Sequence, residues 1–229
     1  MSHNFWEKEY KNPTFLTKEM DPQTDTVRFF KFLKKEEKFD CFDKQLIDLG
    51  CGTGRNSLYA FELGAIPHGM DISKTAISHG LNYLKQRDVD IDLRVGSIGE
   101  TLPYDDDFFD VALDVTSSNS LSEKEREVYR SELKRVLKPG GYMYIKALCK
   151  DGDENAKELL KRFPGAEQDT YILPEQKITE RVWTKQDFMD FYSPIFKILH
   201  LETKESYTTM GDRRYKRRFW IGYMKKESK

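Results

Sequence analysis

The residues of this chain whose spacing indicates chemistry lie in a glycine-rich turn at positions 50–54, where every second residue is glycine. A short apolar segment at 45–48 precedes the turn and ends in Asp48, and a helical pattern at 56–63 follows it. Glycines allow the backbone to approach a ligand closely, and the free N–H groups of a helix start point toward that ligand. The pattern therefore predicts a strand, a turn and a helix that together bind a nucleotide-like cofactor.

The residues just after the turn distinguish between cofactors. A dinucleotide fingerprint of the form G-x-G-x-x-G would need glycine at position 55, which is Arg55. A P-loop would need Lys and then Ser or Thr after its last glycine, but Arg55 and Asn56 follow Gly54. The spacing therefore favours neither a dinucleotide nor a bound phosphate.

A second acidic residue, Asp71, ends the next predicted strand at 66–71. Ligands of open α/β sheets bind in a crevice at the carboxyl ends of the strands, and Asp48 and Asp71 flank the same predicted crevice. The alternative interpretations are that Asp48 caps a helix or turn and that Asp71 is a solvated strand end. The shared crevice favours a role for both carboxylates in binding.

The segment from Asp48 to Gly54 resembles motif I of the class I S-adenosylmethionine (SAM)-dependent methyltransferases, particularly the type 11 and type 25 methyltransferase domains. The resemblance covers residues 44–148, and its further elements are Gly69-Met-Asp-Ile-Ser73, Leu102-Pro-Tyr104, Phe109-Asp110 and Leu137-Lys-Pro-Gly-Gly141. It implies an α/β fold with a Rossmann-like, seven-stranded, mostly parallel sheet, helices on both faces and an antiparallel C-terminal strand. It also implies an enzyme that converts SAM to S-adenosylhomocysteine.

The resemblance implies a role for several residues at the cofactor. Asp48 and the backbone of Gly50 and Gly52 would hold the methionine end of SAM, while Asp71 and Ile72 would hold the ribose. A carboxylate suits the ribose because it accepts two hydrogen bonds at once. The full set that we expect at the cofactor is Trp6, Tyr10, Asp48, Gly50, Cys51, Gly52, Asp71, Ile72, Ser97, Ile98 and Val115.

The adenine end departs from the family pattern. The family often carries Asp beside the adenine, at the position where this chain has Ser97 followed by Ile98. The loop that follows is also one residue longer. The resemblance then implies that the hydroxyl or backbone of Ser97 replaces the usual contact with the adenine amino group.

Methyl transfer from a sulfonium needs in-line alignment and exclusion of water, and it requires no covalent enzyme nucleophile. We therefore name no catalytic residue, and the candidates for a general base are Tyr10, Asp114 and Tyr171. The polar run at 114–120 ends the strand at 109–115, and it lacks the Asn/Asp-Pro-Pro-Tyr/Phe signature of many enzymes that methylate amino groups of nucleic acids. In that run, three residues would either orient a substrate or cap the next helix: Ser117, Ser118 and Asn119.

Two regions outside the core are candidates for a lid. Trp6 and Tyr10 are four residues apart on a possible short helix, so they would either close over SAM or pack as an ordinary helix face. The polar segment at 149–183 interrupts the alternation of strands and helices, and Tyr171 and Arg181 are its candidate pocket residues.

The chain is expected to be one domain with four parts: N-terminal helices and lid (1–40), a SAM-binding core (44–148), a cap insertion (149–183) and a C-terminal helix and hairpin (184–229). Beyond the segments already given, apolar periodicity predicts helices at 24–39, 73–86, 122–137, 156–163 and 188–192 and strands at 91–95, 142–148, 196–203 and 217–224. The expected helix caps are Asp21 or Thr24, Ser73, and Thr184 with Asp187. Residues 138–141 are expected to form a turn.

The composition limits the partners. Lys plus Arg number 38 and Asp plus Glu 39, so the net charge of −1 gives no overall attraction to nucleic acid or to an anionic membrane. Three cysteines without paired spacing and four scattered histidines predict neither a disulfide framework nor a metal site. No segment approaches the roughly 18 apolar residues of a membrane span, and no apolar signal core begins the chain, so we expect a cytoplasmic protein.

One stretch, at 213–218, alternates cations with an aromatic residue and is the best candidate for a polyanionic partner. In the alternative interpretation its cations face solvent on a hairpin strand, where Glu202 and Glu205 neutralise them. The sequence thus favours a small-molecule methyltransferase. An RNA or protein methyltransferase that docks its substrate on 213–218, and a module that binds SAM without catalysis, stay as alternatives. The acceptor atom and the oligomeric state are not indicated.

Overall fold

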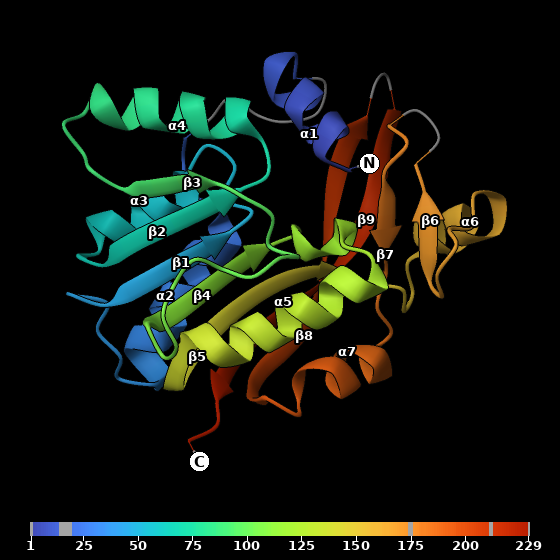
Figure 1. Ribbon diagram of the computed structural model, residues 1–229. Coiled ribbons are helices and arrows are strands. Elements are labelled where there is room, and N and C mark those ends of the chain that lie inside the picture. Colours follow the sequence, from blue (N-terminus) through green and yellow to red (C-terminus); the bar gives the residue numbers. More distant parts are fainter. Residues whose placement is uncertain (1, 14–19, 174–175, 211–212, 229) are drawn as a thin grey trace.

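The computed structural model describes residues 2–13, 20–173, 176–210 and 213–228. Seven strands form one sheet in the order β3-β2-β1-β4-β5-β9-β8 (Figure 1). Strands β1 to β5 run parallel, and β9 lies antiparallel between β5 and β8, which confirms the expected fold class. The strands are β1 (Gln45–Leu49), β2 (Ile66–Asp71), β3 (Asp92–Val95), β4 (Phe109–Val115), β5 (Leu137–Leu148), β8 (Phe196–Met210) and β9 (Arg213–Lys226).

Helices cover both faces of this sheet. Phe29 of α2 and Ala60 of α3 pack into one apolar cluster with strand residues, and α4 joins α3 on the same face. Tyr129 of α5 and Phe188 of α7 pack into the cluster on the other face. The helices are α1 (Ser2–Lys11), α2 (Thr24–Glu36), α3 (Arg55–Glu62), α4 (Lys74–Lys85), the short 3₁₀ helix η1 (Ser118–Ser120), α5 (Glu123–Val136), α6 (Glu154–Arg162) and α7 (Lys185–Tyr192).

Side-chain caps fix most of the helix starts that the sequence predicts. The hydroxyls of Ser73 and Thr184 accept the backbone N–H groups of Ala76 and Asp187. Helix α2 differs, because its cap residue is Gln23, with no side-chain cap bond, rather than Asp21 or Thr24. The backbone N–H of Gln23 instead donates to Asn56 Oδ1 at 3.1 Å, which ties the start of α2 to α3.

Strand β5 begins five residues earlier than expected, at Leu137 instead of Tyr142. The Lys-Pro-Gly-Gly segment was expected to form a turn, but Leu137 already pairs with Phe109 and the register shifts before Val111 pairs with Tyr142. The glycines therefore lie in a bulge of the strand, where Gly140 has φ of +77°.

The insertion after β5 contains a second, two-stranded sheet that the sequence did not predict. It pairs β6 (Thr170–Ile172) with β7 (Thr179–Arg181), and helix α6 packs beside it (Figure 1). Strands of three residues are too short to leave an alternating pattern. Tyr171 and Val182 of this unit pack against Phe219 of β9 and so attach the insertion to the main sheet.

The last two strands extend well beyond the predicted segments 196–203 and 217–224. Their polar ends stay paired, and Lys216 Nζ lies 2.8 Å from Glu205 Oε2, as the sequence analysis expected for a neutralised cation. Arg217 differs from that expectation, because it is buried and contacts Glu180 and Tyr171. We expected a loop containing Gly211 and Asp212 between these two strands, and these two residues lie outside the described ranges.

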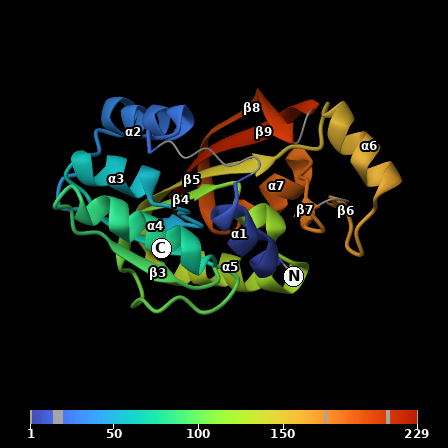
Figure 2. The ribbon, with the colours of Figure 1, turned by 90° about the horizontal axis from the view of Figure 1, so that it is seen from above.

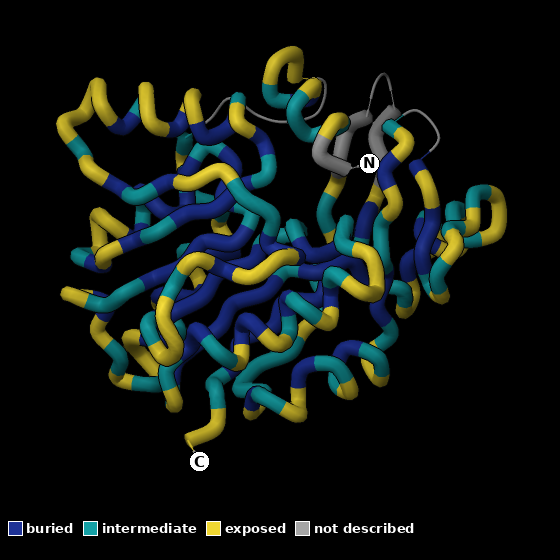
Figure 3. The backbone as a smooth tube through the Cα atoms, in the orientation of Figure 1, coloured by how far each residue is buried: buried dark blue, intermediate teal, exposed yellow. Residues whose placement is uncertain are grey.

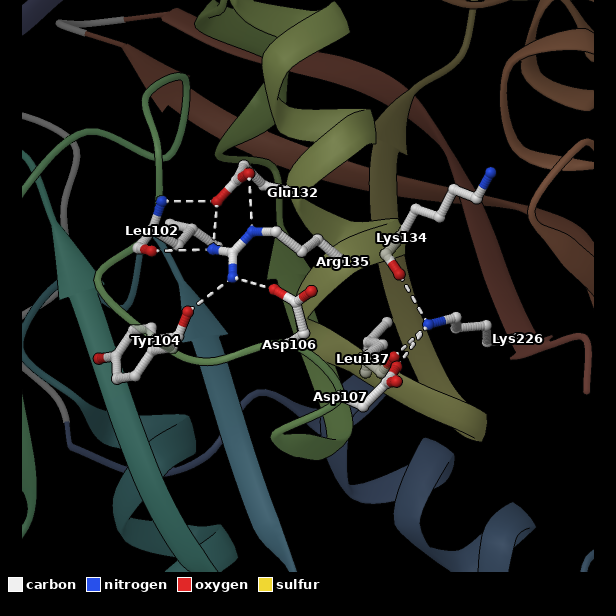
Figure 4. Close-up of polar contacts among 9 residues, drawn as sticks. All are labelled: Leu102, Tyr104, Asp106, Asp107, Glu132, Lys134, Arg135, Leu137 and Lys226. Atoms are coloured by element: carbon white, nitrogen blue, oxygen red, sulfur yellow. Dashed lines mark hydrogen bonds and ion pairs between the residues drawn. The ribbon is translucent and has the colours of Figure 1, made fainter.

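A network on α5 fixes the loop between β3 and β4 (Figure 4). The Arg135 guanidinium donates to the backbone oxygens of Leu102 at 2.9 Å and Tyr104 at 2.7 Å. Glu132 accepts the backbone N–H of Leu102 at 2.8 Å and also binds Arg135. The loop that carries the Leu-Pro-Tyr segment is thus held to one rigid helix.

The strands at the centre of the sheet carry most of the buried residues, and the outer faces of α4 and α6 are exposed (Figure 3). Within the described ranges, no helix is both long and apolar enough to cross a membrane. In the same part of the chain, no three or more His, Cys, Asp and Glu residues are grouped so that they could hold a metal ion.

Candidate functional site

A cavity of about 210 Å³ lies at the carboxyl ends of the central strands, with α1 along one side. Both views show α1 between α4 and the insertion (Figures 1 and 2). Ten of the eleven residues that were expected at the cofactor line this cavity: Trp6, Tyr10, Gly50, Cys51, Gly52, Asp71, Ile72, Ser97, Ile98 and Val115. Asp48 is the exception, since it lies buried without lining the cavity.

The glycine turn has the backbone that its sequence requires. Gly50, Gly52 and Gly54 have φ of +71°, +59° and +82°, a region that side chains with a Cβ rarely adopt. A Cβ at Gly50 would overlap Ser117, and one at Gly52 would overlap the Tyr10 hydroxyl. The turn is therefore glycine-rich both for its backbone conformation and because neighbouring residues approach it closely.

Asp71 joins the turn to the next helix. One carboxylate oxygen accepts the backbone N–H of Gly52 at 2.9 Å, and the other accepts that of Ser73 at 2.8 Å. Each carboxylate oxygen has about two acceptor positions, so one on each oxygen stays available for donors of a ligand in the cavity. This geometry fits a pair of neighbouring hydroxyl groups.

Three carboxyl groups lie buried at the ends of adjacent strands: Asp71 on β2, Asp48 on β1 and Asp114 on β4. Burial raises the pKa of all three, and it raises that of Asp48 to about 7. A cationic ligand would stabilise their ionised forms, whereas a phosphate would be repelled by them. The electrostatics of the site therefore favour a positively charged ligand.

Asp48 lies buried outside the cavity wall. Its carboxylate accepts the Ser57 hydroxyl at 2.8 Å, and only 1% of the residue is exposed. Its raised pKa results first from burial and then from the charges of Asp71 and Asp114, while the nearby Arg55 opposes the shift. This position therefore does not favour direct contact between Asp48 and the methionine end of SAM.

The raised pKa of Asp48 predicts how the affinity for SAM depends on pH. The cationic cofactor stabilises the ionised carboxylate, so binding releases a proton when the pH lies below about 7. The dissociation constant of SAM should therefore increase as the pH falls through 7, by up to about tenfold per pH unit, and level off above it. Calorimetric titrations from pH 5.5 to 8.5 measure this dependence.

The control for this prediction is Asp48→Asn, which keeps an acceptor for Ser57 but cannot ionise. Any pH dependence that persists in this variant belongs to the cofactor's own amine or to another residue. Identical profiles for the wild type and the variant would exclude Asp48 as the titrating group.

The position of Asp114 does not favour the role of general base that was one expectation for it. It is fully buried, does not line the cavity, and accepts hydrogen bonds from Tyr129 Oη at 2.7 Å and from the backbone of Ser117 at 2.9 Å and Ser118 at 3.3 Å. It therefore fixes the turn after β4, which brings Thr116 and Ser117 to the cavity wall.

Ser117, Ser118 and Asn119 do not cap α5, which was one of the two roles expected for them. Ser122 caps that helix itself in a capping box with Glu125. Ser118 and Asn119 are buried, and Asn119 Oδ1 accepts the backbone N–H of Leu148 at 3.2 Å. Of the three candidates, only Ser117 lines the cavity.

Tyr171 and Arg181 do not reach the cavity, so the expectation for both was wrong. Tyr171 is fully buried and its hydroxyl donates to Glu180 at 2.7 Å, next to Arg217. Arg181 lies 3.4 Å from Asp187 of α7. Tyr171 thus bonds within the insertion, and Arg181 joins the insertion to α7.

Tyr10 reaches the glycine turn but is unsuited to act as a base. Burial, with the Asp71 carboxylate nearby, raises the pKa of its hydroxyl well above the usual value, so the group stays protonated at neutral pH. Trp6, one helical turn earlier, lines the same cavity and also packs against the apolar cluster of the insertion. Helix α1 thus connects the cavity to the insertion.

A single carboxylate, Glu7, fastens α1 to the start of α4. It accepts hydrogen bonds from Thr75 Oγ1 at 2.6 Å, Ser73 Oγ at 2.8 Å and the backbone N–H of Thr75 at 3.1 Å. The hydrogen bonds from Thr75 lower the pKa of Glu7 to about 2, so the carboxylate is ionised throughout the physiological range. A negative charge at a helix N-terminus is also favoured by the helix dipole.

Removing this attachment should open the cavity. We expect Glu7→Ala to weaken SAM binding by about tenfold, because α1 would then lose charge-assisted bonds to α4. Hydrogen exchange of α1 should accelerate in the same variant. Lys11→Met is the control. Lys11 Nζ lies 3.2 Å from Glu7 Oε1, but the lysine side chain is mostly exposed, so this ion pair contributes little to the attachment of α1. Equal affinities for the wild type and Glu7→Ala would contradict this role of Glu7.

Sequence reasoning missed part of the cavity wall. The additional lining residues include Gln23, Thr53, Arg55, Asn56, Leu121 and Glu125. Arg55 and Asn56 directly follow the glycine turn, so their position alone could have placed them there. Glu125 carried only the signal of a helix cap.

Comparison with known proteins finds a family match in the central part of the chain. Residues 47–145 match the methyltransferase domain family. Over this segment the chain resembles the class I SAM-dependent methyltransferases. The matched segment contains most of β1, the glycine turn and Asp71. It therefore supplies most of the residues that line the cavity.

The sequence of this chain is 29% identical, over 139 residues, to the phthiotriol/phenolphthiotriol dimycocerosates methyltransferase of Mycobacterium tuberculosis. The match covers 60% of this chain and 50% of the relative, so the chain spans about half of that protein's length.

Two solved structures share the fold of this chain. A SAM-dependent methyltransferase of Methanosarcina mazei superposes with a TM-score of 0.72 at 22% identity, covering 82% of this chain and 94% of that one. The 1,6-didemethyltoxoflavin-N1-methyltransferase of Burkholderia thailandensis, solved with 1,6-didemethyltoxoflavin and S-adenosylhomocysteine, gives 0.63 at 13% identity, covering 90% and 79%.

Proposed function

We propose that this protein transfers a methyl group from SAM to a small-molecule acceptor and releases S-adenosylhomocysteine. The observation that carries the proposal is the cavity itself, which a glycine turn and an available Asp71 carboxylate line and near which two further carboxyls lie buried; such a space suits a cationic nucleoside. The family match supports the same cofactor.

Each part of SAM has a matching group in the cavity. Asp71 would accept the two ribose hydroxyls, and the backbone of Gly50 and Gly52 would hold the methionine end. Asp48 would attract the cationic groups through the field of its ionised carboxylate. The expected direct contact of Asp48 is thereby replaced by an electrostatic role, because Gly50 and Gly52 line the cavity and Asp48 does not.

The residues around the cofactor position the reaction and exclude water. SAM, when bound, supplies an electrophilic methyl group that an acceptor attacks in line. Trp6 and Tyr10 would cover the reacting region from α1, and an aromatic face near a sulfonium is electrostatically favourable. Thr116 and Ser117 supply polar groups that can orient the acceptor.

A small acceptor fits this arrangement better than a macromolecule. Helix α1 lies along the cavity and is fastened by Glu7, which restricts access to it. The buried Arg217 and the paired Lys216 also reduce the charge that the 213–218 stretch presents to a polyanion. The names of the relatives describe methylation of lipid and heterocyclic compounds, which supports the same class of acceptor.

The test uses SAM labelled with tritium in its methyl group. The purified protein is incubated with a cell extract, which is then separated by ultrafiltration into small and large molecules. We expect label in the small-molecule fraction, and none with Asp71→Ala. Label only in RNA or protein would contradict the acceptor class, while binding of SAM without any transfer would favour a non-catalytic module.

A further inference from the structure

One part of the cavity wall, where Leu121 and Glu125 pack over Gly99 next to Ile98, has the chemistry of a site for a flat base. Beyond Asp71, the wall consists of the apolar side chains Ile72, Ile98 and Leu121. A purine attached to a ribose at Asp71 would lie among these side chains, because its faces are apolar and only its edge carries polar groups. This step rests on the proposed binding of SAM.

Glu125 is the carboxylate in this part of the cavity wall. It lies in the first turn of α5, and its chain packs over Gly99, since a Cβ built there would come within 2.7 Å of Glu125 Cβ. Its Oε2 accepts hydrogen bonds from the backbone N–H of Ser122 at 2.7 Å and the Ser122 hydroxyl at 2.6 Å. Both bonds end on Oε2, so Oε1 is the oxygen that can serve a ligand.

Ser97 is less suited to contact the edge of the base. Its hydroxyl oxygen accepts the backbone N–H of Gly99 at 3.2 Å, so it supports its own loop. A hydroxyl is also a weaker acceptor than a carboxylate. The adenine contact was expected from Ser97, but helix α5 offers a charged alternative, the carboxylate of Glu125.

We propose that Glu125 accepts a hydrogen bond from the exocyclic amino group of the adenine and thereby sets the base specificity of the cofactor site. A carboxylate has no hydrogen to donate, so it favours an amino group and repels a carbonyl at the same position. A base with oxygen at position 6 would therefore be rejected. Such specificity arises because the wrong base would leave buried polar groups without hydrogen-bond partners.

The surrounding structure holds Glu125 in place for this task. The loop that contains Ile98 continues to Leu102, which is bound by Glu132 and Arg135 of α5 (Figure 4). The loop and the carboxylate are thus fixed to the same helix, so their separation stays constant. A specificity-determining residue needs such support from a rigid element.

The test compares two ligands and four proteins. The ligands are S-adenosylhomocysteine and S-inosylhomocysteine, which differ in the amino or carbonyl group at position 6 of the base. The proteins are the wild type, Glu125→Gln, Glu123→Gln and Ser122→Ala. Glutamine keeps the capping box but presents an amide that can donate to a carbonyl. Glu123→Gln removes the same charge outside the cavity, and Ser122→Ala weakens the cap but retains the carboxylate.

We expect the wild type to bind the adenosyl ligand roughly ten- to hundredfold more tightly than the inosyl ligand in calorimetric titrations. Glu125→Gln should reduce this ratio to near one or invert it, while both controls keep the wild-type ratio. An unchanged ratio in Glu125→Gln, or no discrimination by the wild type, would overturn the role of Glu125 and leave SAM binding intact. Failure of the wild type to bind S-adenosylhomocysteine would overturn the proposed function and this inference together.

Discussion

Replacement of Asp71 by alanine is expected to weaken SAM binding by about a hundredfold or more, because two charge-assisted hydrogen bonds to the ribose would be lost. The variant also loses the acceptors for the backbone N–H groups of Gly52 and Ser73, which shape the turn. Calorimetric titration of SAM into the wild type and the variant measures the effect, and circular dichroism checks that the fold persists.

Asp92→Asn is a matched control for this substitution. Asp92 lies on the neighbouring strand β3, but its carboxylate binds His68 at 3.0 Å and Arg94 at 2.7 Å outside the cavity. Its neutralisation should leave the affinity for SAM within about twofold of the wild type. Equal losses in both variants would show that Asp71 acts through general charge or stability and does not bind the ribose.

Gly52→Ala should have an effect of similar size. The added Cβ would overlap the Tyr10 hydroxyl, and the residue would be held at φ of +59°, which costs about 1–2 kcal/mol for a residue with a Cβ. We expect SAM binding to fall by about a hundredfold, since the backbone can no longer approach the cofactor. Thermal unfolding should also begin at a lower temperature, and both changes can be measured on the same preparation.

Two further variants separate the causes. Gly140→Ala introduces the same kind of backbone strain, at φ of +77°, but its Cβ would meet only Ser228 Oγ, at 3.6 Å. It should lower stability and leave SAM binding unchanged. Tyr10→Phe combined with Gly52→Ala removes the overlapping hydroxyl, so part of the thermal stability should return while binding stays weak. Full recovery of binding in the double variant would show that Gly52 serves only to accommodate Tyr10.

The core of the fold was predictable because its signals are local. The strand at 109–115 is mostly apolar, with Asp110 and Asp114 as its only charged residues, and its bounds were predicted to the residue. Pro67 lies near the start of β2, where pairing with β3 begins only at His68, so that pairing does not need the N–H that proline lacks. In contrast, the β6–β7 sheet and the ends of β8 and β9 depend on pairing between distant segments, which no local pattern records.

The cofactor side of the site was predictable to a similar degree. Glycine spacing fixes where the backbone can approach a ligand, so the turn and Asp71 could be placed without coordinates. Residue spacing does not indicate in which direction a side chain points. Asp114 and Tyr171 both looked like polar groups near the crevice, but both lie inward and serve buried hydrogen bonds. Glu125 was missed because a helix cap explains its presence equally well.

The most direct test of the account is calorimetric titration of SAM and, separately, of NAD into the wild-type protein at pH 8, above the pKa of Asp48 of about 7. The account predicts one site for SAM with a dissociation constant in the micromolar range and no binding of NAD, whose pyrophosphate would face the buried carboxyls. Binding of NAD without binding of SAM would contradict it.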